Sequence, residues 1–96
     1  MYVYNFPATI FVPKDFTGQV DETEHVVEEA NEAMRAVWES PARHVSELLD
    51  CIHACETALR SYDKGLVDTC CERVHDKNSL RGYYGEPRVL MGREDG

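Results

Sequence analysis

The chain has 96 residues, a formal net charge of −8 from ten Lys and Arg against eighteen Asp and Glu, and 43% hydrophobic residues. That length accommodates one small domain, and the hydrophobic content excludes an intrinsically disordered chain. The acidic balance excludes a protein that binds the phosphate backbone of a nucleic acid, since such proteins carry an excess of Lys and Arg.

The first predicted element is an extended N-terminal segment over residues 1–20. Tyr, Phe, Val and Ile are frequent in residues 1–14, and Pro7 and Pro13 interrupt them, so we expect short extended pieces or a loose hairpin. Gly18 is expected to close the segment. The N-terminal segment lacks the basic start that is typical of a secretory signal. No stretch of the chain reaches the roughly 18–20 apolar residues that cross a membrane.

Two helices are predicted next. The first runs from about residue 21 to Glu39 and ends at Ser40-Pro41, because the residue before a proline is disfavoured in the α region. Its apolar residues at helical spacing are Val27, Ala30, Met34, Val37 and Trp38. The second runs from about Ala42 to Ser61, and its apolar side consists of Val45, Leu48, Leu49, Ile52, Cys55 and Leu59.

A third helix follows a turn at residues 63–65 and stops before Gly82, a residue typical of helix C-termini. Residues 82–96 are expected to be loop or tail. The prediction is therefore a single all-α domain over residues 1–96 with a helical core at about 21–81. Because so short a chain buries little surface by itself, we expect it to complete a helical bundle as a homodimer or homotetramer.

Acidic residues form the first chemical pattern. Glu28, Glu29 and Glu32 fall within one arc of the first helix, and Glu47 and Asp50 are one turn apart on the second. If the helices are antiparallel neighbours, these carboxylates converge. Such a cluster needs a compensating charge, and an all-oxygen ligand set favours Mg²⁺ or Mn²⁺.

The alternative is that these acids are a solvated surface. The arc on the first helix lies nearly opposite the stripe of Val27, Met34 and Val37, as a surface arc would. Glu47 fits this alternative less well, because small residues flank it on the helical wheel and a neighbouring helix could approach there. These small residues are Cys51, Ala54, Cys55 and Ala58.

The end of the third helix carries a basic pattern. Lys77 and Arg81 are four residues apart beside Asn78, in line with Leu66, Cys70 and Val74 on the wheel. Cations on a packed side could bind phosphate oxygens. The alternative is that they extend into solvent at a helix C-terminus, where positive charge is favoured in any case.

Together these motifs resemble the MazG-like nucleoside triphosphate pyrophosphohydrolases. The chain reads E-E-A-N-E at 28–32 and E-L-L-D at 47–50, similar to the family's E-E-x-x-E and E-x-x-D motifs. K-N-S-L-R-G-Y-Y at 77–84 is similar to the ending that follows the last core helix of that family. The resemblance covers about two thirds of the chain. In this family large aliphatic residues commonly follow the second motif, whereas C-I-H-A-C-E stands here.

The resemblance implies an all-α, oligomeric enzyme that hydrolyses a nucleoside triphosphate between the α and β phosphates with Mg²⁺. It implies these metal ligands: Glu29, Glu32, Glu47 and Asp50. Glu28 would either support a metal ligand from behind or help to orient the attacking water, and a carboxylate of the cluster, Glu29 or Glu47, would accept the proton of that water. Phosphate contacts would come from Lys77, Asn78 and Arg81. Base-stacking candidates are Trp38, Tyr83 and Tyr84, although aromatic residues at helical spacing more often pack in a core.

Three other interpretations compete. A thiol metal site is suggested by Cys51, His53, Cys55, Cys70, Cys71 and His75, but the C-x-x-C turns of structural zinc sites are absent. A non-catalytic helical interaction module of the same fold is the second. A hydrolase of the phosphoribosyl-ATP pyrophosphatase type is the third. The cysteine spacing indicates reduced thiols, so a cytoplasmic location is expected, with no nucleic acid polymer and no membrane as partner.

Overall fold

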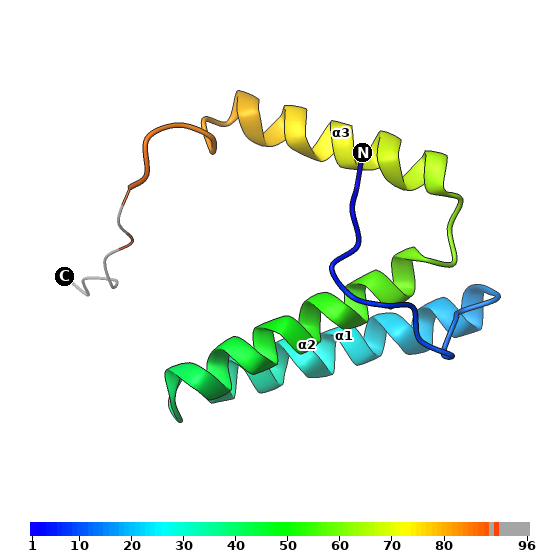
Figure 1. Cartoon of the computed structure of the whole chain (residues 1–96), viewed down its shortest axis with the longest axis horizontal. Coiled ribbons are helices and arrows are strands. Elements are labelled where there is room, and N and C mark those ends of the chain that lie inside the picture. Colours follow the sequence, from blue (N-terminus) through cyan, green and yellow to red (C-terminus); the bar gives the residue numbers. More distant parts are fainter. Residues whose placement is uncertain (89, 91–96) are drawn as a thin grey trace.

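The computed structural model describes residues 1–88 and 90, and within that part of the chain it contains three helices and no strand (Figure 1). The helices are α1 (Phe16–Ala36), α2 (Pro41–Leu59) and α3 (Lys64–Leu80). The predicted all-α class is confirmed. Most of the predicted C-terminal tail beyond residue 88 lies outside the described residues. No described helix combines the length and the apolar character needed to cross a membrane.

α1 begins five residues earlier than the sequence pattern predicted, and the extended segment ends at Asp15. The Asp15 carboxylate accepts a hydrogen bond from the Gly18 N–H at 2.8 Å and thereby caps the helix. Gly18 therefore lies in the first turn of α1, and the prediction that it closes the extended segment was wrong. A Cβ at this position would lie 3.2 Å from the Cα of Pro13, so glycine allows the close approach of the preceding chain.

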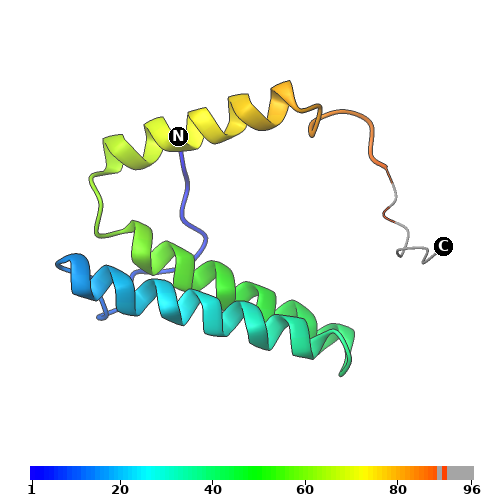
Figure 2. The same cartoon turned by 180° about the vertical axis from the view of Figure 1, so that it is seen from behind.

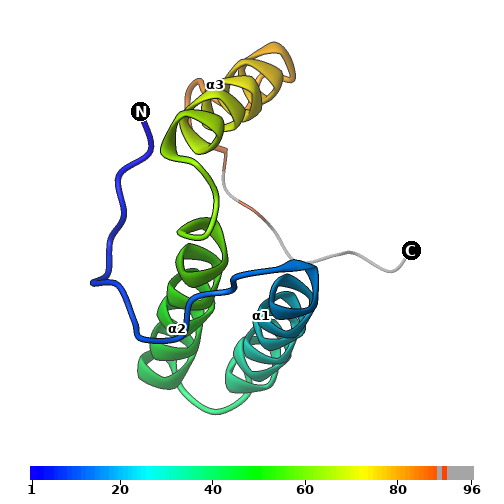
Figure 3. The ribbon, with the colours of Figure 1, turned by 90° about the vertical axis from the view of Figure 1, so that its right-hand side faces the viewer.

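The break between α1 and α2 is where the sequence predicted it. α1 ends at Ala36, and Ser40 caps α2 by accepting a hydrogen bond from the Arg43 N–H at 3.2 Å. Pro41 occupies the first position of α2, where its missing N–H costs nothing. The short connection makes α1 and α2 an antiparallel hairpin, seen nearly end-on in Figure 3.

Small residues allow the two helices of the hairpin to approach closely. Ala33 and Ala36 of α1 and Ala54 of α2 are buried, with at most 5% of their surface exposed. The Cys51 thiol of α2 lies 3.9 Å from the carbonyl oxygen of Val26 in α1. The predicted approach of a neighbouring helix along the small-residue side of α2 is confirmed at these positions.

The larger apolar side chains of the hairpin face away from this interface. On α1, Met34 is 68% exposed and Val37 is 51% exposed, and the turn residue Trp38 is 87% exposed. The exposed apolar residues of α2 are Val45, Leu48, Leu49 and Ile52. The apolar stripe of α1 is thus exposed in this chain, and of the acidic arc on the other side Glu28 and Glu32 are also exposed while Glu29 is partly covered.

α3 stands apart from the hairpin (Figures 1 and 2), and among the described residues only α1 and α2 form an extensive helix–helix interface. The side of α3 that was expected to be packed is open in this chain, since Leu66 and Val74 are each 50% exposed. α3 ends as predicted. Gly82 adopts a φ of +76°. The Gly82 N–H donates to the Ser79 carbonyl oxygen at 3.0 Å, and the Tyr83 N–H donates to the Asn78 carbonyl oxygen at 2.9 Å.

Residues 1–15 form an N-terminal strap. It starts beside α3, where the Tyr2 N–H donates to Asp68 Oδ1 at 2.9 Å, and then passes along α2 to the start of α1 (Figure 3). Its main anchor is Glu56 of α2, which is completely buried. The strap therefore connects α2 and α3, because it is hydrogen-bonded to Glu56 of α2 and to Asp68 of α3.

Candidate metal centre

Three carboxylates from α1 and α2 converge between the two helices. Oxygen atoms of Glu29 and Glu32 from α1 and of Glu47 from α2 all lie within 4.8 Å of one another. The spacing of three residues places Glu29 and Glu32 on one face of α1, and the small neighbours of Glu47 allow that face to approach. Among the described residues this is the only such group of metal-binding side chains, and the Cys and His residues of the rival thiol site do not form one.

Glu47 is the buried member of the cluster, at 6% exposure. Its Oε1 is 3.0 Å from the guanidinium of Arg43, one turn earlier on α2, while its Oε2 is buried with no hydrogen-bond partner. Arg43 also contacts Glu39 at 3.2 Å, and that hydrogen bond together with the charges of Glu47 and Glu39 raises the pKa of the guanidinium. A buried carboxylate oxygen without a partner is costly, and a cation at this point would satisfy it.

The charge of the cluster fits a divalent cation. Carboxylates outnumber cations here: Glu29, Glu32 and Glu47 lie together, and the guanidinium of Arg43 that contacts Glu47 is shared with Glu39. The donor atoms are all carboxylate oxygens, which hard cations such as Mg²⁺ and Mn²⁺ prefer. Glu29, Glu32 and Glu47 are therefore a donor set that suits a hard divalent cation, the class of metal predicted from the sequence.

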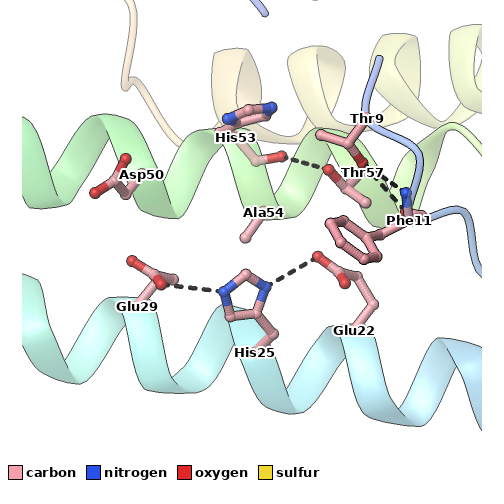
Figure 4. A pocket seen from close by; sticks show the side chains of 9 residues that line it. All are labelled: Thr9, Phe11, Glu22, His25, Glu29, Asp50, His53, Ala54 and Thr57. Atoms are coloured by element: carbon pink, nitrogen blue, oxygen red, sulfur yellow. Dashed lines mark hydrogen bonds and ion pairs between the residues drawn. The ribbon is translucent and has the colours of Figure 1, made fainter. Parts of the chain in front are cut away.

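His25 connects the cluster to the rest of α1. Its two ring nitrogens lie 3.3 Å from Glu22 Oε1 and 3.1 Å from Glu29 Oε1 (Figure 4). The hydrogen bond to Glu22, opposed by partial burial and assisted by the nearby carboxylate charges, raises the pKa of His25 above its ordinary value. His25 therefore helps to hold the Glu29 carboxylate in place. Sequence analysis missed this role, although the spacing of three and four residues between these side chains was visible.

A cavity of about 450 Å³ extends from the acidic cluster along the hairpin toward the strap (Figure 4). Glu29 and Asp50 line one end, and Phe11 and Thr57 line the other. The remaining lining residues are Thr9, Glu22, His25, His53 and Ala54. This volume falls within the usual range of small-molecule sites.

The other two acidic residues of the predicted site lie near the cluster without joining it. Asp50 is exposed and lines the same cavity as Glu29, but its oxygens are not among those that converge. Glu28 is exposed on α1 next to Glu29. The structure thus brings together three of the four predicted metal ligands.

The predicted substrate contacts lie elsewhere in the chain. Lys77 and Asn78 are on α3 and Arg81 is its C-terminal cap, on the helix that stands apart from the hairpin. Trp38 lies in the turn between α1 and α2, and Tyr84 stacks on His75 with ring centroids 4.9 Å apart. None of the five lines the cavity.

The strap contributes Thr9 and Phe11 to the wall of the cavity. Glu56 accepts hydrogen bonds from the Asn5 N–H at 2.7 Å, the Phe6 N–H at 2.9 Å and the Tyr2 hydroxyl at 3.0 Å. Burial by itself would raise the pKa of Glu56, but these three donors outweigh it and lower the pKa. Burial and the hydrogen bond to Glu56 raise the pKa of Tyr2 to about 12. No local signal pairs residues fifty positions apart, so this anchor was not predictable.

Comparison of the chain with protein-family models, with curated proteins and with solved structures finds no match.

Proposed function

We propose that the protein is a MazG-like, Mg²⁺-dependent nucleoside triphosphate pyrophosphohydrolase, which releases a nucleoside monophosphate and pyrophosphate. The observation that carries the proposal is the convergence of Glu29, Glu32 and Glu47, with a buried Glu47 oxygen that has no partner. The motif resemblance supplies the reaction class, and the adjoining cavity has room for a small ligand.

In this proposal Glu29, Glu32 and Glu47 hold the metal, with Asp50 at the cavity edge as a further ligand. When bound, Mg²⁺ neutralises phosphate charge and lowers the pKa of a coordinated water. Arg43 compensates Oε1 of Glu47, while Oε2 is buried without a hydrogen-bond partner and is free to bind the metal. Glu28 orients the attacking water, and the carboxylate of Glu29 or Glu47 accepts its proton.

The proposed enzyme works as a homodimer or homotetramer. Within one chain, the phosphate-binding candidates Lys77, Asn78 and Arg81 lie on the helix that stands apart from the acidic cluster. We therefore assign their contact with the phosphates to an assembly in which a second copy covers the apolar faces of the hairpin. Exposed apolar side chains on both helices support this assignment.

The test is pyrophosphate release from a panel of ribo- and deoxyribonucleoside triphosphates, with and without Mg²⁺. We expect Mg²⁺-dependent release, and a loss of at least a hundredfold in Glu47→Gln, since that variant removes a charged ligand while conserving volume. Glu72→Gln, an equivalent change at an exposed position of α3, is the matched control and should retain turnover.

A non-catalytic interaction module is the second candidate. The separation of the basic residues of α3 from the acidic cluster favours it, because one chain does not assemble a full phosphate site. No pyrophosphate release from any nucleotide, at concentrations where the oligomer is intact, would reject the enzyme and favour the module.

A further inference from the structure

Several long-range hydrogen bonds hold the N-terminal strap in one position. Chain ends are ordinarily poorly ordered unless something ties them down. Here a completely buried carboxylate, Glu56, accepts two backbone N–H groups and one hydroxyl from the strap. Burying a carboxylate is expensive unless every contact is made, so the anchor specifies one position of the strap.

A second set of contacts fixes the strap just before it reaches the cavity. The Phe6 ring stacks on His53 with centroids 4.8 Å apart and planes 17° from parallel. The Arg60 guanidinium lies 4.2 Å from the centre of the Tyr4 ring and donates hydrogen bonds to the carbonyl oxygens of Phe6 and Pro7. Residues 4–7 are therefore held against α2, and Thr9 and Phe11, which follow them, line the cavity.

The strap end of the cavity combines an aromatic face with hydrogen-bond acceptors. The Phe11 side chain lines the cavity and is 70% exposed, so its ring is open to a ligand. The Thr57 hydroxyl donates to the His53 carbonyl oxygen at 3.1 Å, which leaves its lone pairs available as acceptors. Glu22 adds a carboxylate at the same end: its Oε1 is 3.3 Å from His25 Nδ1, and its Oε2 is an acceptor only (Figure 4).

We infer that this end of the cavity is the nucleobase subsite, an inference that rests on the proposed function. Phe11 stacks on the base, and oxygen atoms of Glu22 and Thr57 accept hydrogen bonds from its exocyclic amino group. The subsite therefore selects bases with an amino group over those with a carbonyl oxygen at the same position, since two facing acceptors repel. Glu56 is a positioning residue, because it acts through the strap and does not touch the base.

Matched nucleotide pairs test the inference. CTP and UTP carry an amino group and a carbonyl oxygen, respectively, at the same position, as do ATP and ITP, and the adjacent ring nitrogen changes from an acceptor to an N–H donor, so kcat and KM are measured for all four. The wild-type protein should favour the amino member of each pair by about tenfold in kcat/KM, the size expected for one specific hydrogen bond. Glu22→Gln should abolish that ratio, because an amide both donates and accepts. Glu24→Gln, exposed on the same helix, should preserve it.

Two further variants separate stacking from positioning. Phe11→Ala should raise KM for all four nucleotides by about tenfold while kcat stays within about threefold, as for loss of one base-stacking contact. Glu56→Gln should raise KM in the same way, with unchanged helix content by circular dichroism and unchanged Mn²⁺ binding by electron paramagnetic resonance. A variant that also lost Mn²⁺ binding would contradict a role through the strap alone.

Equilibrium binding keeps the two proposals separable. CMP and UMP are titrated into the protein with Mg²⁺ while the amide resonances of residues 9–11 and of Thr57 are followed by NMR. Tighter binding of CMP with shifts at these amides supports the subsite, whatever the turnover. Turnover together with equal affinity for CMP and UMP, and no shift of these amide resonances, would overturn the subsite and leave the proposed function standing. Absence of pyrophosphate release would reject the proposed function alone and would not by itself reject the subsite.

Discussion

At the scale of single residues, carboxylates in this protein have two opposite roles that depend on what surrounds them. Glu56 is completely buried and all its strap contacts are donors, so the charge is stabilised without a metal. Glu47 is nearly as buried, but only one of its oxygens has a partner. The same side chain is thus a structural anchor at one position of α2 and a metal-ligand candidate nine residues earlier.

The anchoring carboxylate predicts a pH dependence for the strap. The pKa of Glu56 is lowered in the folded chain, so it stabilises the strap above the ordinary glutamate pKa of about 4.3, and this contribution is lost as the pH falls through the folded value. We expect the Asn5 and Phe6 amide resonances to report one shared transition below that ordinary value. An NMR titration from pH 7 to pH 2 measures it.

The Glu56→Gln variant is the control for this titration. It replaces one acceptor oxygen by a donor facing the strap, so the shared transition should disappear and the two amides should exchange faster at every pH. Amides that titrated normally in the variant would show that another group controls the strap.

At the scale of elements, the ends of the helices are set by side chains and by one glycine. Asp15, Ser40 and Asp63 each accept a hydrogen bond from an N–H in the first turn of their helix. Gly82 closes α3 in a left-handed conformation, which residues with a Cβ rarely adopt. These local signals explain why α2 and α3 lie close to their predicted positions.

Substitution of Gly82 tests the C-terminal signal. A Cβ at this position has open space around it, so Gly82→Ala carries only the conformational penalty of positive φ, about 1 kcal/mol. Thermal unfolding should show a lowered midpoint, with hydrogen exchange accelerated in the last turn of α3. Gly85→Ala, also in open space but without positive φ, should leave both unchanged.

At the scale of the whole molecule, the chain presents two surfaces that it does not itself cover. The hairpin packs through small residues, so many larger apolar side chains of α1 and α2 remain at least 40% exposed, among them Val27, Met34, Val45, Leu48, Leu49 and Ile52. α3 adds a further partly apolar side that no described helix packs against. Contiguous apolar surface of this kind is typical of an interface.

Self-association is the expected consequence. We predict that sedimentation velocity shows a dimer or tetramer at micromolar concentration, because burial of apolar side chains contributes roughly 25 cal/mol per Å². Leu49→Glu, which places a charge on the apolar side of α2, should shift the protein toward monomer. Val3→Glu, the same kind of change on an exposed strap position, should not. A monomeric wild-type protein would contradict the prediction.

Much of this protein was predictable from local pattern. Apolar periodicity, Ser40-Pro41 and Gly82 indicated three helices and two of their boundaries, because caps and breakers act within a few residues. The motif spacing identified Glu29, Glu32 and Glu47 as partners, since antiparallel neighbouring helices bring one-turn pairs together. The early start of α1 was missed because its cap, Asp15, lies beyond a glycine that resembled a terminator.

The tertiary structure decided which face of each helix is inward. Periodicity places apolar and acidic residues on opposite sides of α1, but only the packing of α1 on α2 determines that the apolar stripe stays exposed while Glu29 and Glu32 approach Glu47. The same holds for the strap, whose attachment to Glu56 spans about fifty residues and therefore leaves no local trace. Contacts between distant residues depend on how whole elements pack, and this is why the sequence predicted that Glu29, Glu32 and Glu47 converge but did not predict the wall of the adjoining cavity.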